Sequence, residues 1–233
     1  MQYRISSAFI GCAAKCCIQG CSPLTISWIP VKQQIEDRFS LNIKRVKNLV
    51  AIYSHRLSGP GKGTGKGRRG HQETDVLRAA TVLLHASLED VLRSLAYWKL
   101  PSAAATELEQ IALVGGTVTK FNLGALAAHR GKSVDDVIKE STDASLERSN
   151  YNNNAEVSAL LISIGLDTVP LRPNMATLDQ AMKRRHQIVH RADANPNPQP
   201  GSGNHKVASI SPVKLNDWIA NTEQFVKAVL VQV

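Results

Sequence analysis

An arginine and a histidine in the last quarter of the chain have the types and spacing for chemistry on a phosphate. Arg185 precedes His190 by five positions in the stretch Lys183–His190, which reads KRRHQIVH. A guanidinium is planar and always charged, so it can hold and neutralise a phosphate group. An imidazole titrates near neutral pH, so it can move a proton. The pair favours phosphoryl transfer on RNA, although this spacing by itself is a weak signal.

The two histidines of this stretch also allow a metal-binding interpretation. His186 and His190 are one helical turn apart, which suits zinc, and Asp193 could supply a third ligand. However, Gln187 stands where the H-E-x-x-H motif of zinc proteases has its glutamate. We therefore expect neither a bound metal ion nor another cofactor.

A purely structural interpretation treats the stretch as the basic end of a surface helix, near the negative pole of the helix dipole. It accounts for Arg184 and Arg191 but not for Arg185, because the helical period places Arg185 on or near the apolar side. A buried guanidinium is costly unless it is paired or reaches a cleft. Arg185 and His190 also diverge by about 140° on an ideal helix. Only the long arginine stem, or a second copy of the helix, could bring both to one substrate.

The helix that carries these residues is expected to begin at the capping box Thr177–Gln180 and to run through His190. Apolar side chains recur at steps of three and four along most of the chain, which is typical of amphipathic helices. Further helices are expected at 35–53, 74–100 with Thr74 as its cap, 106–114, 121–129, 133–148, 155–164 and 213–231. No segment alternates as a β-strand does, and no internal repeat is visible. The prediction is an all-α helical bundle with additional short helices.

A polar edge runs along the longest of these helices. His85, Glu89 and Arg93 are four residues apart and therefore lie on one side of the helix. This spacing routinely produces a ladder of ion pairs on a surface. The alternative is that the edge borders a functional groove.

Two segments, 59–72 and 193–211, are expected to be flexible loops. The first contains six glycines and four cations between Gly59 and Gly70, a composition that cannot hold a helix. It does not match a nucleotide-binding P-loop, because Gly67 follows Lys66 where that motif has serine or threonine. Both a solvated loop and a loose contact with an RNA backbone stay open.

The bulk composition favours a globular domain with an anionic partner. The 233 residues are 43% hydrophobic and carry a formal net charge of +9, which favours RNA or DNA. All four cysteines fall between Cys12 and Cys21, whereas a secreted disulfide-stapled domain would spread them through the fold. We expect residues 1–33 to be a poorly ordered extension and residues 34–233 to form one domain. We also expect a cytoplasmic protein without a membrane span.

Several of these segments resemble one known family. The run Arg185–His190 is similar to the R-x4-6-H signature of the HEPN superfamily, in the branch with a polar residue after the arginine. The segments Asn42–Leu49 and Leu77–Arg93, and the chain around Trp218, resemble the RiboL-PSP-HEPN type. The resemblance extends from about Gln34 to the C-terminus.

This resemblance implies a HEPN-type bundle that is commonly dimeric, with the motif helices of two subunits facing one cleft. It also implies a metal-independent endoribonuclease of a defence, toxin–antitoxin or stress system. RNA would be cleaved by attack of its 2′-hydroxyl, leaving a 2′,3′-cyclic phosphate. Arg185 would bind the scissile phosphate and His190 would be the general base or acid, with His186 and Glu89 in support.

Further cations of the motif helix would make general electrostatic contacts with RNA. These residues are Lys183, Arg184 and Arg191. Some members of the superfamily have lost catalysis. The alternative function is therefore a non-catalytic RNA-binding or antitoxin-like interaction module.

Overall fold

The computed structural model describes residues 31–57, 71–116, 123–194 and 208–233. Most of the expected N-terminal extension, the glycine-rich stretch and most of the second expected loop lie outside these residues. The described part of the chain is helical and has no strand, which confirms the all-α prediction. None of its helices combines the length and the apolar character needed to cross a membrane.

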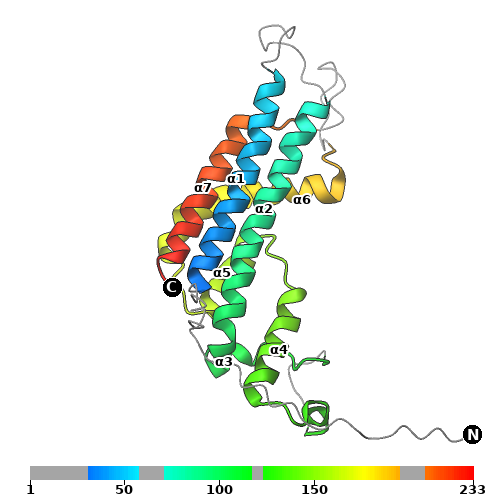
Figure 1. Cartoon of the computed structure of the whole chain (residues 1–233), viewed down its shortest axis with the longest axis vertical. Coiled ribbons are helices and arrows are strands. Elements are labelled where there is room, and N and C mark those ends of the chain that lie inside the picture. Colours follow the sequence, from blue (N-terminus) through cyan, green and yellow to red (C-terminus); the bar gives the residue numbers. More distant parts are fainter. Residues whose placement is uncertain (1–30, 58–70, 117–122, 195–207) are drawn as a thin grey trace, which may run out of the picture.

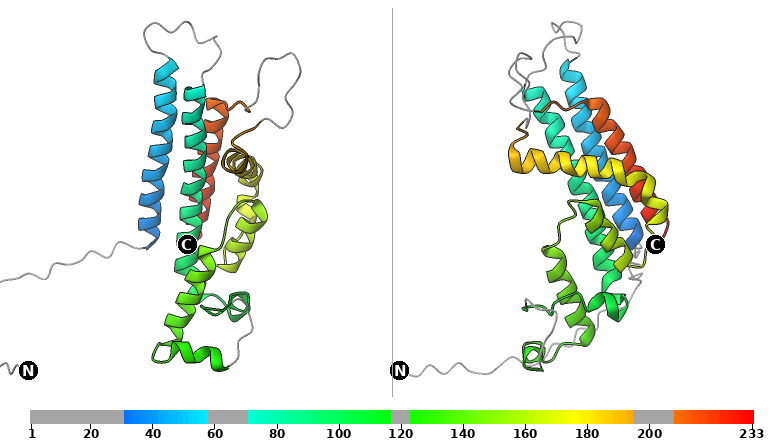
Figure 2. Two further views of the ribbon diagram at one scale, coloured as in Figure 1. Left: turned by 90° about the vertical axis from the view of Figure 1, so that its right-hand side faces the viewer. Right: turned by 180° about the vertical axis from the view of Figure 1, so that it is seen from behind.

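Long helices form the body of the molecule. α1 (Val31–Leu57) and α2 (His71–Lys99) lie side by side in opposite directions, and α7 (Pro212–Leu230) packs along them (Figure 1). α6 (Arg172–Arg191) crosses this layer on one face, as the rear view in Figure 2 shows. Because α6 packs against both α2 and α7, residues of the motif helix can meet the polar edge of α2.

The predicted apolar stripes of the three long helices form the core, and each predicted position in them is buried. They are Ile35, Phe39, Ile43, Val46, Val50 and Tyr53 on α1, Leu77, Ala80, Leu84, Leu88, Val91 and Leu95 on α2, and Leu215, Trp218, Ile219, Thr222, Phe225, Val226 and Val229 on α7. Burial of one large aliphatic side chain stabilises a fold by roughly 1.5–3 kcal/mol. The stripes therefore fix the position and rotation of α2, and with them its polar edge.

A smaller region extends from the C-terminal end of α2 (Figure 1). It contains α3 (Ala105–Leu108) and α4 (Val134–Glu147), after which α5 (Asn154–Ser163) packs against both α2 and α6. Three 3-10 helices complete the described structure: η1 (Leu100–Ser102), η2 (Leu123–His129) and η3 (Val169–Leu171).

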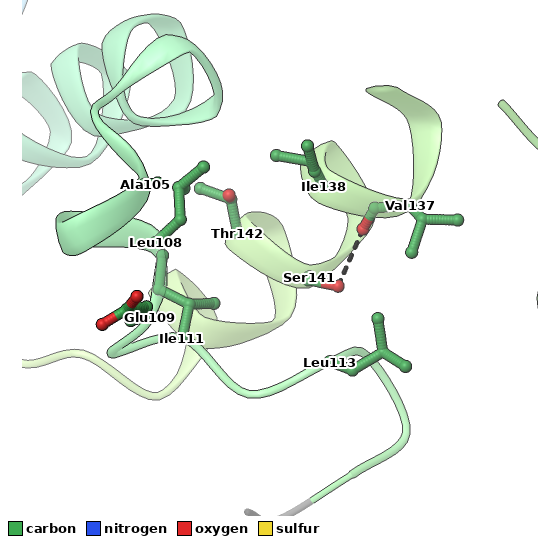
Figure 3. A pocket seen from close by; sticks show the side chains of 9 residues that line it. All are labelled: Ala105, Leu108, Glu109, Ile111, Leu113, Val137, Ile138, Ser141 and Thr142. Carbon is green, nitrogen blue, oxygen red and sulfur yellow. Dashed lines mark hydrogen bonds between the residues drawn. The ribbon is translucent and has the colours of Figure 1, made fainter. Parts of the chain in front are cut away.

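A cavity of about 340 Å³ lies between α3 and α4 (Figure 3). Its lining is mostly aliphatic, with Leu108, Ile111 and Ile138 among its residues. The Ser141 hydroxyl faces this cavity but donates to the carbonyl of Val137 at 2.7 Å (Figure 3). The cavity of the smaller region is therefore lined mainly by apolar side chains.

Two predicted helix starts were wrong. α6 begins at Arg172, so Thr177 lies within the helix and does not cap it. Pro173 occupies the first turn of α6, where a missing backbone N–H is tolerated, and the helix can therefore start before the expected box. α2 begins at His71, three residues before the expected cap Thr74.

Two short predicted helices also differ from expectation. The helix expected at 106–114 is limited to Ala105–Leu108, and a 3-10 helix at Leu123–His129 replaces the α-helix expected at 121–129. Helix nucleation is unfavourable, so segments of one or two turns gain too few hydrogen bonds to propagate without packing. By contrast, the predicted capping box at Ser133 is confirmed, because its hydroxyl accepts from the Asp136 amide and the Asp136 carboxylate accepts from the Ser133 amide.

Candidate active site

Arg185 lies at the junction of α6, α2 and the segment between α4 and α5. Its side chain is half-buried, in agreement with the inward orientation expected from the helical period. Nη1 donates a hydrogen bond to Asn152 Oδ1 at 3.2 Å. The buried Nε atom has no hydrogen-bond partner among the described residues. Arg185 is thus oriented by a neutral acceptor, and its Nε atom is closed to solvent.

Glu89 on α2 supplies negative charge next to this arginine. Its side chain is 17% exposed, and His85 Nε2 lies 3.3 Å from its Oε1 atom. Burial raises the pKa of the Glu89 carboxyl, but His85, Arg185 and Arg93 together overcome this effect and hold its pKa below the ordinary value. Glu89 is therefore a carboxylate at neutral pH, which suits it to orient Arg185 and not to donate a proton.

The predicted ladder on α2 thus borders the site. Beyond Glu89, Arg93 Nη2 donates to the carbonyl of Ser149 at 2.7 Å and ties α2 to the segment that follows α4. Tyr151 in this segment is buried, and burial raises the pKa of its phenol to about 12, with Arg93 lowering it and Glu89 and Tyr97 raising it further. Tyr151 is therefore a neutral packing element of the site.

Asn152 and Tyr151 lie between the helices expected at 133–148 and 155–164, and the sequence analysis assigns neither of them a role. Their role follows from the contact of this segment with α6 and α2, which are distant in sequence. The only local signal was the unusual density of asparagine in the run NYNNN from Asn150 to Asn154.

His186 and His190 lie on the outer side of α6, with exposed side chains. Their ring centroids are 4.5 Å apart and the rings are tilted by 42°. α6 is continuous through its last residue, Arg191. Arg185 and His190 therefore remain on different sides of one helix. Within the described part of a single chain, no contact joins them.

Asp193 does not lie beside the two histidines. α6 ends at Arg191, and the next two residues, Ala192 and Asp193, have left-handed backbones with φ of 46° and 58°. This turn directs the Asp193 side chain, which is 1% exposed, into ion pairs with Arg78 Nε and Arg184 Nη2, each at 2.7 Å. No group of three potential metal ligands occurs among the described residues.

The three cations expected to contact RNA differ in availability. Lys183 is 75% exposed and forms a surface ion pair with Asp179, and Arg191 is exposed. The Arg184 side chain is only 12% exposed and its Nη2 atom also donates to the carbonyl of Ala208 at 3.0 Å. Arg184 therefore has a structural role that its place in a basic run does not indicate.

A comparison with protein-family models finds a match to the family described as RiboL-PSP-HEPN over residues 40–232. Comparisons with curated proteins and with solved structures find no match. The family match includes all the long helices except the first turns of α1, and both Arg185 and His190. The all-helical fold agrees with it. The chain therefore belongs to the RiboL-PSP-HEPN family of the HEPN superfamily.

Proposed function

We propose that the protein is a metal-independent endoribonuclease that cleaves RNA by attack of the 2′-hydroxyl. Family membership supports an RNA-related role. The observation that carries the proposal is the state of Arg185, which is held inward by Asn152 and lies close to Glu89. Such a guanidinium is suited to bind a phosphate and to stabilise the charge that develops on it.

In the proposed reaction, Arg185 binds the non-bridging oxygens of the scissile phosphate. His190 removes the proton of the adjacent 2′-hydroxyl, and the 2′-oxygen attacks phosphorus. The bond from phosphorus to the 5′-oxygen breaks, and that oxygen takes up the proton from the imidazolium that His190 has become. The products are a 2′,3′-cyclic phosphate and a 5′-hydroxyl, and the balance requires no metal ion. His186, whose ring lies against that of His190, orients it.

Because Arg185 and His190 lie on different sides of α6, the proposed reaction requires a second copy of the chain. A homodimer in which two α6 helices face one cleft would place His190 of one copy near Arg185 of the other. A symmetric pairing is the commonest form of assembly among soluble oligomers. We therefore include a homodimer in the proposed active form.

The test is incubation of the purified chain with RNA in EDTA. We expect products that end in a 2′,3′-cyclic phosphate, and a loss of rate of at least about 100-fold in Arg185→Ala and in His190→Ala. His55→Ala, which removes an exposed histidine of α1, is the matched control and should cleave like the wild type. Absence of cleavage, or cleavage that survives His190→Ala, would contradict the proposal.

One observation favours the second candidate, an RNA-binding or antitoxin-like module without catalysis. Arg185 and His190 do not meet among the described residues of one chain, so a monomer would hold a phosphate-binding arginine without His190 beside it. This candidate predicts RNA binding that weakens steeply with salt and yields no cleavage products. A defence, toxin–antitoxin or stress role belongs to the endoribonuclease proposal and depends on cleavage.

A further inference from the structure

Two exposed histidines form a pair on the outer side of α6. His186 and His190 are separated by one helical turn, and their ring centroids are 4.5 Å apart. Within the part of the chain that the structure describes, neither imidazole takes part in a hydrogen bond or an ion pair. Both rings therefore have nitrogen atoms available to a ligand from solvent.

The separation of the two rings suits one transition-metal ion held between them. Zinc binds imidazole nitrogen at about 2.0–2.1 Å with tetrahedral geometry, so two nitrogen ligands of one ion lie about 3.4 Å apart. Rings with centroids 4.5 Å apart can reach this separation through small side-chain rotations, because the nitrogen atoms lie at the rim of each ring. Water can occupy the coordination positions that the protein leaves open.

The end of α6 is fixed, which preserves the spacing of the two histidines. The Asp193 amide donates to the carbonyl of Gln187 at 3.1 Å, just beyond the last residue of the helix. The Asp193 carboxylate forms ion pairs with Arg78 and Arg184, each at 2.7 Å. Helix ends commonly fray, whereas this one is tied to α2. An ion would therefore meet two ligands on an ordered backbone, which reduces the entropic cost of binding.

The chemistry of two imidazoles selects the class of ion. Imidazole suits zinc, copper and nickel, whereas magnesium and calcium prefer oxygen ligands. The charge of Lys183 opposes a cation here but is offset by the ion pair with Asp179 at 2.6 Å, and Arg191 opposes it as well. Because no third protein ligand joins the pair among the described residues, the site can hold an ion reversibly but does not have the closed ligand set of a structural zinc site.

We propose that His186 and His190 together bind a zinc ion and that this ion inhibits the protein. A neutral imidazole has one nitrogen with a free lone pair, which can either bind a metal ion or accept a proton. Zinc on His190 would therefore block the group that takes the proton of the 2′-hydroxyl. The inhibition rests on the proposed function, whereas the binding of the ion does not. The ion takes no part in the cleavage reaction.

The first experiment measures zinc binding to the full-length chain. The cysteines between Cys12 and Cys21 are alkylated beforehand, because thiolates also bind zinc. Calorimetric titration should then show saturable binding of one ion per chain. Loss of either imidazole, in His186→Ala or in His190→Ala, should weaken the affinity at least about tenfold. Zinc should also raise the melting temperature of the wild type more than that of either variant.

His55→Ala is the matched control, because it removes an exposed histidine from α1 and leaves the pair on α6 intact. It should bind zinc like the wild type. Magnesium should not compete with zinc for the pair, because it prefers oxygen ligands. Absence of saturable zinc binding, or equal affinity in the wild type and both α6 variants, would overturn the proposal.

The second experiment measures RNA cleavage with free zinc in place of EDTA. Zinc at about ten times its dissociation constant leaves about one site in eleven empty, so the wild-type rate should fall about tenfold. At the same zinc concentration His186→Ala should lose no more than about half of its own rate, because its affinity is at least about tenfold weaker. An effect of zinc on the RNA itself would slow both proteins equally.

The two experiments separate the metal site from the nuclease. Zinc binding that leaves wild-type cleavage unchanged, or equal inhibition of the wild type and His186→Ala, would overturn the inhibitory role. A chain that binds zinc through both histidines but cleaves no RNA would refute the proposed nuclease and leave the metal site standing. Cleavage without zinc binding would refute the metal site alone.

Discussion

Arg184 and Asp193 form a buried ion pair in which Arg184 Nη2 lies 2.7 Å from Asp193 Oδ2. Arg78 of α2 binds the same oxygen, and both arginines also donate to the carbonyl of Ala208. The cluster joins α2, the end of α6 and the chain that leads into α7. A left-handed backbone costs a residue other than glycine roughly 1–2 kcal/mol. The ion pairs offset this cost at Ala192 and Asp193 and hold the end of the motif helix.

The first prediction concerns the stability of this cluster. Asp193→Asn leaves two half-buried guanidinium groups without their shared counter-charge, so it should lower the free energy of unfolding by about 3 kcal/mol. The measurement is urea unfolding monitored by circular dichroism. Asp179→Asn, which breaks the exposed pair with Lys183, is the control and should cost less than about 1 kcal/mol. Similar losses in both variants would show that the cluster does not have the role given to it.

The second prediction is a pH dependence that arises from Glu89. Its pKa is lower in the folded chain than the ordinary value of 4.5, so the ionised carboxylate stabilises the fold above that pH. This contribution is lost as the pH falls through the folded-state pKa. Glu89→Gln should therefore be less stable than the wild type at pH 7, and the difference should shrink as the pH falls below 4.5.

Urea unfolding at several pH values between 3 and 7 measures this difference. Glu147→Gln, which removes an exposed carboxylate at the end of α4, separates the effect of Glu89 from that of losing any one negative charge. A stability difference for Glu89→Gln that is constant across this range would contradict the interpretation.

The third prediction concerns Tyr151. Its hydroxyl is buried and has no hydrogen-bond partner among the described residues. Tyr151→Phe should therefore leave stability nearly unchanged, whereas Tyr151→Ala should cost about 3–5 kcal/mol through loss of a buried ring. Ultraviolet titration of phenolate, compared between the wild type and Tyr151→Phe, should show one phenol ionising only near pH 12. If Tyr151→Phe instead removes a phenol that ionises near pH 10, the high pKa does not belong to Tyr151.

The fourth prediction is that Asn152 acts through Arg185. Asn152→Ala removes the acceptor that holds the guanidinium, and we expect RNA cleavage to fall about tenfold, as for one hydrogen bond to a charged group. In an Arg185→Ala background the same change should have no further effect on the residual rate. The double-mutant cycle is therefore the measurement. Independent effects of the two substitutions would show that Asn152 does not act by positioning Arg185.

The fifth prediction tests whether two copies share a site. Arg185→Ala and His190→Ala proteins are each expected to be inactive, but a mixed dimer would contain one site with both native residues. Random exchange of subunits should restore up to about a quarter of the wild-type activity. Exchange verified by mass spectrometry without any recovery would place both residues of a working site in one chain.

Local periodicity was sufficient to predict the long helices and their buried sides. The apolar stripes of α1, α2 and α7 are continuous over many turns, so burial of those sides is the dominant favourable term whatever their partners are. Short elements such as α3 were predicted less well, because a few residues provide neither enough hydrogen bonds nor enough apolar area to fix a helix. The start of α6 was placed at Thr177 because a capping pattern occurs there by chance within the helix.

By itself, the sequence determined the all-helical class, the family signature at Arg185 and His190, and the inward orientation of Arg185. Each of these depends on residues within a few turns of one helix. Only the tertiary structure decided the partners: Asn152 for Arg185, and both Arg78 and Arg184 for Asp193. These contacts join residues up to 115 positions apart. They depend on how whole helices are placed against one another, which is set by the sum of many weak packing contacts that no local spacing encodes.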